Sequence, residues 1–340
     1  MKNSFMKISG AVAGALMFAA PLQAQSVEEF YSGKTVELYI GYSVGGGYDT
    51  YARTIASHIG KHIPGNPTVV AQNMPGAGSL RLTNWLYQAA PQDGTVFGTI
   101  SRSAPFEPLI GNQAADFQAD QLNYIGNANK ETSLCASTSA SGIESIEEVM
   151  ESTLLVGGTG AGSDPGFHAE VLNATIGTQF EVIDGYPGGN DVVLAMERGE
   201  VGGRCGWSWS SVKSRNMEMV EDGSVTLLVQ IANNAHPDLP DVPLAIDLAP
   251  DQRSRQLINF IVAPQEMGRP YVAPPNVPAD RLAALRAAFV ATMNDPDFLA
   301  EAAATNLEIT PTTGEEMQAV VESVYATDPA VIEEIVAIQQ

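Results

Sequence analysis

Short apolar runs alternate with amphipathic stretches between residues 35 and 101 of the chain. Runs rich in valine, isoleucine and leucine have the length of strands, whereas the segments between them carry apolar residues at helical spacing. Proline and glycine at the segment ends, as in Pro64-Gly65, supply turns. This alternation predicts a parallel sheet with right-handed crossovers. The expected strands are Val36–Gly41, Thr68–Gln72 and Thr95–Ser101, and the expected helices run from about Thr50 to Ile63 and from Ser79 to Ala90.

The same alternation recurs between residues 143 and 232. Asp164 followed by Pro165 is a strong start signal for one of the helices, because proline fits the first helical turn. This second unit predicts a second α/β sheet. The expected helices are Ile143–Glu151, Pro165 to about Thr175 and Asp191–Arg198, and the expected strands are Thr153–Val156, Phe180–Asp184, Val201–Trp207 and Val225–Ala232.

The composition changes again from about Leu257. A strand is expected at Asn259–Ala263, an extended proline-rich segment at Arg269–Pro278, and then helices that have no sheet of their own and so pack back on the first sheet. The fold class is therefore α/β with two lobes, one formed by residues 25–126 plus 256–340 and the other by residues 127–255. The C-terminal helices are expected at Ala279–Asn294, Pro296–Thr305, Gly314–Ala326 and Pro329–Gln340.

Four of the expected strand-to-helix turns are rich in glycine. A helix N-terminus presents unpaired N–H groups and the positive end of a dipole, and glycine lets a ligand approach that backbone closely. Open α/β sheets bind ligands at the carboxyl ends of their strands, so these turns predict an anion site in a cleft between the lobes. The turns are Ser43-Val-Gly-Gly-Gly-Tyr-Asp49, Asn73-Met-Pro-Gly-Ala-Gly78, Gly157-Gly-Thr-Gly-Ala-Gly-Ser-Asp164 and Gly185-Tyr-Pro-Gly-Gly-Asn190.

The charge of the chain excludes nucleic acid as a partner. The 340 residues include 39 acidic and 17 basic side chains, for a net charge of −22. Such an acidic surface repels nucleic acid and anionic membranes. It also repels an anionic ligand at long range, so an anion site has to rely on local backbone donors and one or two arginines.

The N-terminus predicts export. Lys2 and Lys7 precede an apolar run from Ile8 to Ala20, and a small residue, Ala24, stands at the expected cleavage point. This order is that of a secretory signal peptide over residues 1–24, and the apolar run is too short to span a membrane stably. The exported protein is expected to be soluble and monomeric, without a cofactor.

The two cysteines, Cys135 and Cys205, fit an exported protein in which one disulfide forms. The closed loop would contribute on the order of 4 kcal/mol in the chain-entropy model. A metal site is the competing interpretation, but it lacks the spacing and the neighbouring histidines. His58 and His62 are four apart on one expected helix, but no glutamate stands beside His58, so a solvated helix face is favoured over a metal site.

Five blocks of sequence resemble the receptors of tripartite tricarboxylate transporters, the Bug-type periplasmic solute-binding proteins. The first runs from Tyr42 to Arg53 and the second from Val69 to Gly78. The others are Ala90–Gly94, Gly185–Gly189 and the pair Leu239–Pro243 and Ala273–Pro278. They occur in the family's order over nearly the whole chain. The resemblance implies a type II-like periplasmic-binding-protein fold, with a mainly parallel sheet flanked by helices in each lobe.

The resemblance also implies a function and a set of ligand-binding residues. The receptor would capture a small organic carboxylate and deliver it to an ion-coupled transporter with one large and one small membrane subunit, and it would not be an enzyme. No metal site is implied. The implied ligand-binding residues are Tyr42, Ser43, Gly46, Gly47, Asp49, Asn73, Gly76, Ala77, Gly78, Ser79, Ser101, Thr159, Gly160, Ser163, Asp164, Tyr186, Gly188, Gly189, Arg204 and Trp207.

The segment that carries Arg204 departs from the family. Gly202 stands where the family commonly has an acidic residue, and the Pro264–Pro270 insertion is also unusual. Arg204 could pair with a ligand carboxylate or form a structural salt bridge, and Trp207 could line the pocket or belong to the core. Arg102, next to Ser101, is a weaker candidate of the same kind as Arg204.

Two other functions compete with the receptor. A secreted serine hydrolase would need a Ser/His pair in the cleft, and His168 is the only histidine near a glycine turn. A ligand sensor for a membrane signalling protein would share the same fold. The identity of the carboxylate stays open at this level.

Overall fold

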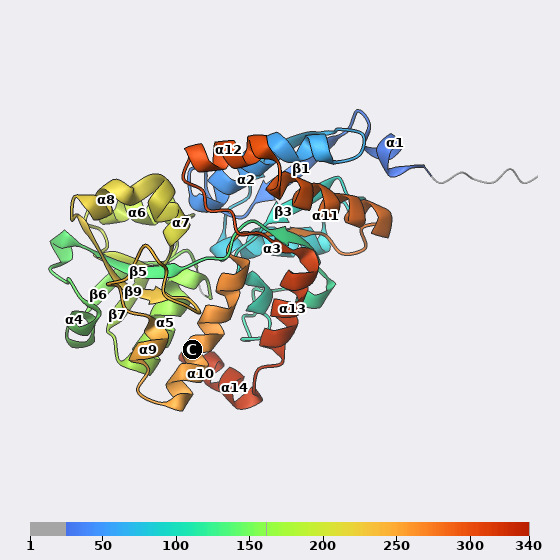
Figure 1. The fold of residues 1–340 in the computed structure, drawn as a ribbon. Coiled ribbons are helices and arrows are strands. Elements are labelled where there is room, and N and C mark those ends of the chain that lie inside the picture. Colours follow the sequence, from blue (N-terminus) through green and yellow to red (C-terminus); the bar gives the residue numbers. More distant parts are fainter. Residues whose placement is uncertain (1–24, 161, 340) are drawn as a thin grey trace, which may run out of the picture.

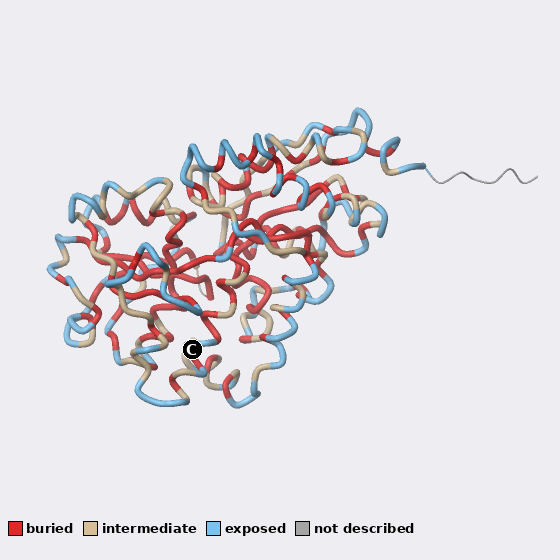
Figure 2. Tube along the Cα trace, in the orientation of Figure 1, coloured by how far each residue is buried: buried red, intermediate tan, exposed pale blue. Residues whose placement is uncertain are grey.

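Two β-sheets lie side by side, each flanked by helices, in the computed structural model, which describes residues 25–160 and 162–339 (Figure 1). The predicted signal peptide lies outside the described residues. Within them, no helix is long and apolar enough to cross a membrane. Buried residues follow both sheets and continue through the region where the two halves of the molecule meet (Figure 2).

The first sheet has six strands in the order β11-β4-β10-β3-β1-β2. The three N-terminal strands pair in parallel, as the alternating pattern predicts. The remaining pairings, of β10 with β3 and β4 and of β11 with β4, are antiparallel, and they involve the two strands that the chain adds after it has built the second sheet. The strands are β1 (Thr35–Ile40), β2 (Thr68–Asn73), β3 (Val96–Thr99), β4 (Asn123–Asn127), β10 (Pro270–Ala273) and β11 (Thr312–Thr313).

The second sheet has five strands in the order β7-β6-β8-β5-β9. Strand β6 pairs in parallel with β7 and β8, whereas β5 pairs antiparallel with β8 and β9. Both sheets are thus mixed: β10 and β11 run against the other strands of the first sheet, and β5 runs against the other strands of the second. The α/β class with two helix-flanked sheets is as predicted. The strands are β5 (Ser133–Thr138), β6 (Leu154–Gly157), β7 (Phe180–Ile183), β8 (Gly203–Ser208) and β9 (Val225–Ile231).

Helices cover the faces and ends of the two sheets. The long C-terminal helices α11, α12 and α13 pack against α2 and β4 of the first half, as expected. The last helix, α14, instead packs against α5 and α10 beside the second sheet (Figure 1). The helices are α1 (Val27–Tyr31), α2 (Gly47–Ile59), α3 (Leu80–Gln88), α4 (Ile146–Glu151), α5 (Asp164–Ile176), α6 (Gly189–Glu197), α7 (Trp209–Ser211), α8 (Met217–Glu221), α9 (Ala245–Leu248), α10 (Gln252–Val262), α11 (Ala279–Met293), α12 (Pro296–Ala304), α13 (Gly314–Tyr325) and α14 (Pro329–Ile338).

The strand predicted at Asn259–Ala263 is wrong, because this segment belongs to helix α10. Asp251 caps the helix, since its side chain accepts a hydrogen bond from the amide of Ser254. The apolar run then forms one helical face, and Phe260 meets Phe167 of α5 edge to face at 6.0 Å. A short apolar run fits a buried strand and a buried helix equally well by periodicity, and the cap decides between them.

The chain passes between the sheets along two neighbouring segments, residues 128–132 and 263–269. The amide of Gly268 donates to the carbonyl of Asn129 at 3.0 Å, and that of Glu131 donates to Gln265 at 2.8 Å. The two crossings are therefore hydrogen-bonded to each other. Few backbone links join the halves here, which is the arrangement that permits hinge rotation between lobes.

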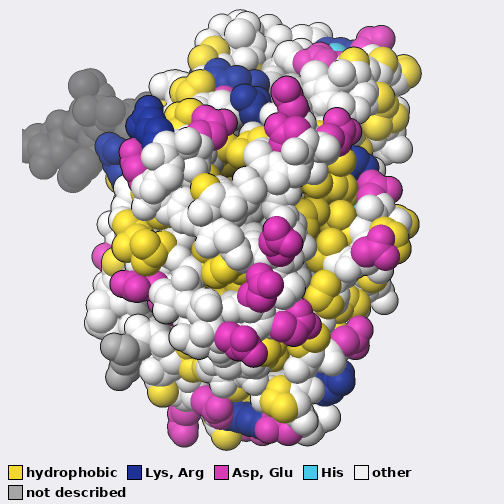
Figure 3. Space-filling model, turned by 90° about the vertical axis from the view of Figure 1, so that its left-hand side faces the viewer, with side chains coloured by type: hydrophobic (Ala, Val, Ile, Leu, Met, Phe, Trp, Pro, Cys, Tyr) yellow, Lys and Arg dark blue, Asp and Glu magenta, His cyan; other side chains and the backbone are white. Residues whose placement is uncertain are grey.

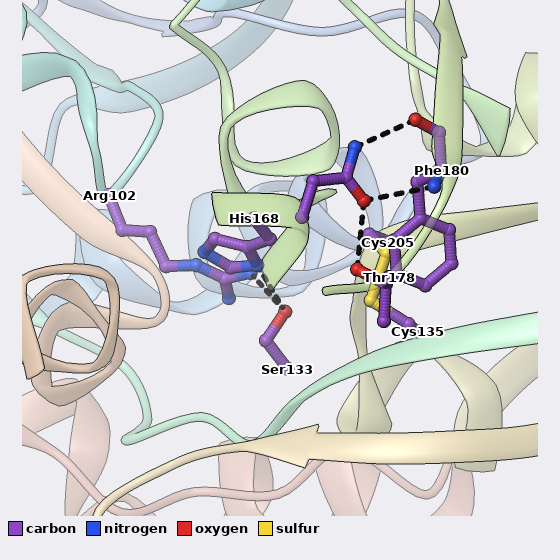
Figure 4. Close-up of a disulfide and its surroundings, with 8 residues drawn as sticks. Arg102, Ser133, Cys135, His168, Thr178, Phe180 and Cys205 are labelled. Atoms are coloured by element: carbon purple, nitrogen blue, oxygen red, sulfur yellow. Dashed lines mark hydrogen bonds between the residues drawn. A yellow bond between two sulfur atoms is a disulfide. The ribbon is translucent and has the colours of Figure 1, made fainter. Parts of the chain in front are cut away.

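Cys135 of β5 and Cys205 of β8 form a disulfide between neighbouring antiparallel strands of the second sheet (Figure 4). Both residues are fully buried. All six residues of β5 are buried, so apolar and polar residues do not alternate along it. The sequence therefore lacks the period-two pattern that predicts a half-buried strand.

We expect no titratable thiol in the denatured, non-reduced protein, because both cysteines are bonded to each other. A thiol assay in denaturant checks this, and the reduced sample should give two thiols as its control. Two thiols without reduction would contradict the disulfide.

Candidate functional site

A cavity of about 70 Å³ lies where the carboxyl ends of strands from both sheets meet. Residues that follow β1 and β3 form one wall, and residues from β8, α6 and the turn after β6 form the other. This is the place that the glycine turns predict. Of the predicted residues, those that line the cavity are Tyr42, Gly46, Gly47, Thr159, Asp164, Gly189, Arg204 and Trp207.

The N-terminus of α2 forms part of the first wall. Gly46 is the N-cap residue, and as a glycine it has no side chain that could accept hydrogen bonds from the first amides of the helix. A Cβ atom on Gly47 would lie 2.1 Å from Ser211 Oγ and 2.9 Å from Arg269 Nη2, so any side chain at this position would force these two residues to shift. Tyr48, on the same turn, stacks on Tyr42 at 4.6 Å between ring centroids.

Asp49 and Asn73 hold this turn from outside the cavity. Asp49 Oδ2 accepts from the amide of Gly45 at 2.9 Å, and Oδ1 accepts from Arg53 and from Asn73 Nδ2, each at 2.9 Å. Burial raises the pKa of Asp49, but the hydrogen bonds from Arg53, Asn73 and Gly45 outweigh it and lower the pKa, so the carboxylate stays ionised. The structure therefore gives these two residues a positioning role.

The second glycine turn does not reach the cavity. The amide of Gly78 donates to the carbonyl of Thr159 at 2.9 Å, and a Cβ atom on Gly78 would lie 2.6 Å from that of Ser163. Ser79 Oγ accepts from the amide of Ser101 at 3.1 Å. This turn thus braces one lobe against the other. The predicted residues outside the cavity lining are Ser43, Asp49, Asn73, Gly76, Ala77, Gly78, Ser79, Ser101, Gly160, Ser163, Tyr186 and Gly188.

Direct contacts between the halves close the rim of the cavity. Ser43 Oγ donates to Asp191 Oδ2 at 2.5 Å, and Asn190 Nδ2 donates to the carbonyl of Val44 at 3.0 Å. Arg215 Nη1 donates to Thr50 Oγ1 at 3.1 Å. The two halves are therefore in direct contact along the rim of the cavity.

Arg204 lies in the wall of the cavity without an acidic partner. Its side chain is buried, with 5% of the residue exposed. Nη1 donates to the carbonyl of Gly189 at 2.7 Å, and the guanidinium lies 5.1 Å from the centre of the Trp207 ring. Nε has no partner among the described residues. Burial, with Arg102 nearby, lowers the pKa of Arg204 to about 9, so the group is charged at pH 7.

Arg102 reaches from the first half of the molecule into the second. Its Nε bonds Asp164 Oδ2, and Nη1 donates to Ser208 Oγ at 3.1 Å. Burial raises the pKa of Asp164, but the charges of Arg102 and His168 and a hydrogen bond from Ser103 outweigh it and lower the pKa. Arg102 and Asp164 therefore form a buried, ionised pair across the cleft.

Arg269 completes the floor of the cavity. It is the last residue of the second crossing, and its Nη2 lies 3.3 Å from Glu131 Oε2 on the first crossing. The same nitrogen donates to Ser210 and Ser211, and the guanidinium lies 4.7 Å from the centre of the Tyr48 ring. The insertion that departs from the family pattern thus supplies a residue of the site, which sequence reasoning missed.

The cavity has the opposite charge balance to the rest of the protein. Four arginines line it (Arg102, Arg204, Arg215 and Arg269), but its only acidic residue among those described is Asp164. The whole chain has 39 acidic and 17 basic residues, and acidic side chains are scattered over the face shown in Figure 3. The positive charge is therefore concentrated where a ligand would lie.

A serine and a histidine do meet, but away from the cavity. His168 Nδ1 lies 3.3 Å from Ser133 Oγ, which also accepts from Arg102 Nη2 at 3.4 Å (Figure 4). Ser133 is fully buried, and neither residue lines the cavity. Burial lowers the pKa of His168 to about 4. A nucleophile has to reach its substrate, so this pair does not support a hydrolase.

The one cluster of possible metal ligands among the described residues is occupied by a lysine. His236, Asp238 and Glu308 have ligand atoms within 4.8 Å of one another. Lys213 Nζ lies between the carboxylates, 2.7 Å from Asp238 and 2.9 Å from Glu308. The ammonium group of Lys213 therefore occupies the position that a metal ion would need between these carboxylates.

Comparisons with known proteins identify a family. A family model described as tripartite tricarboxylate transporter family receptor matches residues 51–336. A search of curated proteins finds no match.

Three solved structures are similar over nearly their whole length. The periplasmic binding protein BugD has a TM-score of 0.73 at 18% identity, over 91% of this chain and 98% of that one. MatC from Rhodopseudomonas palustris with bound malate has a TM-score of 0.69 at 18% identity, over 91% and 99%. An R. palustris protein with adipate has a TM-score of 0.68 at 16% identity, over 90% and 97%. The fold is thus that of periplasmic binding proteins.

Proposed function

The chain belongs to the tripartite tricarboxylate transporter receptor family, a family of periplasmic solute-binding receptors, and we propose that it captures a small organic carboxylate in the cavity between its two halves. Residues 25–126 plus 256–340 and residues 127–255 are the proposed lobes, although α10 and α14 pack beside the second sheet. The ligand is then handed to an ion-coupled transporter with one large and one small membrane subunit. The receptor acts as a monomer and not as an enzyme.

The unpaired Arg204 carries this proposal. A buried charge is costly unless it is paired, and nothing among the described residues neutralises this one. A ligand carboxylate would supply the missing partner and match the planar guanidinium. The proteins of similar fold that hold malate and adipate bind ligands of this class.

Closure of the lobes follows from the same arrangement. The carboxylate would bridge Arg204 of the second half and the α2 N-terminus of the first, so it binds the closed state better than an open one. A ligand shifts such an equilibrium only by its differential affinity for the two states. The rim contacts of Ser43 and Asn190 then add to that difference.

Arg204→Ala should weaken carboxylate binding by about 1.5–3 kcal/mol, the range for hydrogen bonds to a charged group. The unliganded protein should lose little stability, because the arginine has no structural ion pair to break. Calorimetry with a panel of organic acids and thermal unfolding measure the two effects. Arg198→Ala, at an exposed position in the same half, is the control and should change neither. A drop in stability with unchanged affinity would remove Arg204 from the site.

A further inference from the structure

We propose that Arg215 limits the length of the ligand that the cavity admits, because its side chain stands between the cavity and a larger groove on the surface of the second half. This inference rests on the proposed function and adds a residue that determines specificity. The lining of the two hollows, the contacts of Arg215 and the turn that carries it support the assignment.

Arg215 belongs to the walls of two hollows. The cavity between the halves measures about 70 Å³, whereas an open groove on the second half measures about 470 Å³. Arg215 and Asn216 line both of them. A ligand that extends from the cavity in this direction therefore has to pass these two side chains, and the arginine is the larger obstacle.

Contacts with the first half hold Arg215 across this passage. Its Nη1 donates to Thr50 Oγ1 of α2 at 3.1 Å. Its Nη2 lies beside the tip of the first glycine turn, 3.8 Å from the place that a Cβ atom on Gly45 would take. Because Arg215 is exposed and its acceptor is a neutral hydroxyl, a substitution can remove the side chain without leaving a charge buried.

The turn that carries Arg215 is wider than an α-helical turn. The segment η6 (Val212–Asn216) is a π-helix between α7 and α8. Such turns are rare and occur often at functional sites. Ser211, directly before η6, and Arg215 and Asn216 within it all line the cavity. The turn is therefore part of the site, and its geometry determines where Arg215 stands.

The groove beyond Arg215 suits a hydrocarbon chain better than a second carboxylate. Its lining combines two methionines with three acidic side chains: Met196, Met219, Glu197, Glu218 and Asp222. A ligand carboxylate in the groove would meet like charges, whereas a hydrocarbon chain would contact the flexible thioether side chains. Without Arg215, a long monocarboxylate should therefore gain more affinity than a dicarboxylate of the same length.

Calorimetry with propionate, hexanoate and adipate tests the inference on the unmodified protein and on Arg215→Ala. The unmodified protein should bind propionate at least about tenfold tighter than hexanoate, because the cavity has no room for three further methylene groups. In Arg215→Ala the chain can reach the groove, so the affinity for hexanoate should rise roughly tenfold or more relative to that for propionate. Adipate should gain less than hexanoate.

Thr50→Val tests whether the hydrogen bond across the cleft holds Arg215 in place. Valine keeps the shape of threonine but offers no acceptor, so the hexanoate-to-propionate ratio should shift in the same direction as in Arg215→Ala, by a smaller factor. Arg198→Ala is the control, because this exposed arginine of the same half lines neither hollow, and it should leave the ratio unchanged.

The outcomes separate this inference from the proposed function. The same hexanoate-to-propionate ratio in folded Arg215→Ala and in the unmodified protein would overturn the assignment and leave a carboxylate receptor intact. An equal loss of affinity for all three acids would also overturn it, because Arg215 would then act as a charge that binds the ligand and not as a limit on its length. If none of the acids binds to either protein, the proposed function fails as well.

Discussion

Arg102→Ala is expected to lower the free energy of unfolding by about 3–5 kcal/mol at pH 7, the cost of removing one partner of a buried ion pair. Arg102 is 1% exposed, and its guanidinium bonds Asp164, Ser208 and Ser133. Without it the Asp164 carboxylate remains buried and loses its main counter-charge. Urea denaturation of the unliganded protein measures the effect.

The control is Arg198→Ala, which removes an exposed arginine that lies 3.8 Å from Glu200. Surface pairs of this kind contribute at most about 1 kcal/mol. The free energy of unfolding of this variant should therefore stay within about that amount of the value for the unmodified protein. A loss in Arg102→Ala no greater than in the control would show that Asp164 finds another partner or takes up a proton.

The same pair predicts a pH dependence whose sign follows from Asp164. Its pKa in the folded protein lies below the ordinary value of 3.8, because Arg102 and His168 outweigh the effect of burial. The pair therefore stabilises the protein above the unfolded pKa, and this contribution is lost as the pH falls through the folded pKa. Between pH 7 and pH 4 the unmodified protein keeps this contribution, whereas in Arg102→Ala burial without the counter-charge raises the pKa of Asp164, so its carboxyl group protonates and the variant is destabilised less as the pH falls. The stability difference between the two proteins should thus shrink from pH 7 to pH 4, and a constant difference would contradict this account.

Much of the fold could be predicted from local sequence patterns. The alternating apolar runs identify β1, β2 and β3 and their parallel pairing, and Asp164-Pro165 marks the start of α5. Strands β4 and β5 were missed, because β5 is buried along its whole length and contains Ser133, Ser137 and Thr138. Polar residues at buried strand positions give no period-2 signal, and only the tertiary structure supplies their partners.

The candidate site could be predicted only where a local sequence pattern marks its residues. The first glycine turn follows an expected strand and Arg204 lies within another, and the structure brings both to one cavity. The second glycine turn has the same local pattern but braces the lobes, since Gly78 bonds Thr159 across the cleft. Arg269 and Ser211 enter from segments with no ligand-binding pattern. Their position depends on how the crossings place one half against the other, which no local pattern encodes.

Gly47→Val is expected to abolish measurable ligand binding while the protein stays folded. Gly47 is the first residue of α2, and a Cβ atom there would lie 2.1 Å from Ser211 Oγ and 2.9 Å from Arg269 Nη2. Ser211 belongs to the opposite half, so the added side chain fills the cavity and holds the halves apart. The helix itself tolerates the change, because valine adopts helical angles at a cost of less than about 1 kcal/mol.

Gly47→Ala gives the intermediate step, since one methyl group forces smaller shifts of Ser211 and Arg269. Overpacking of this size costs about 1–3 kcal/mol, so affinity should fall roughly ten- to a hundredfold. Gly166→Ala is the matched control: this glycine lies in the first turn of α5, outside the cavity, and its Cβ atom would meet Val182 at an ordinary 3.5 Å. Calorimetry and far-UV circular dichroism on the three variants measure affinity and folding. Full affinity in a folded Gly47→Val would place the ligand outside this cavity, because the substitution leaves no room for it there.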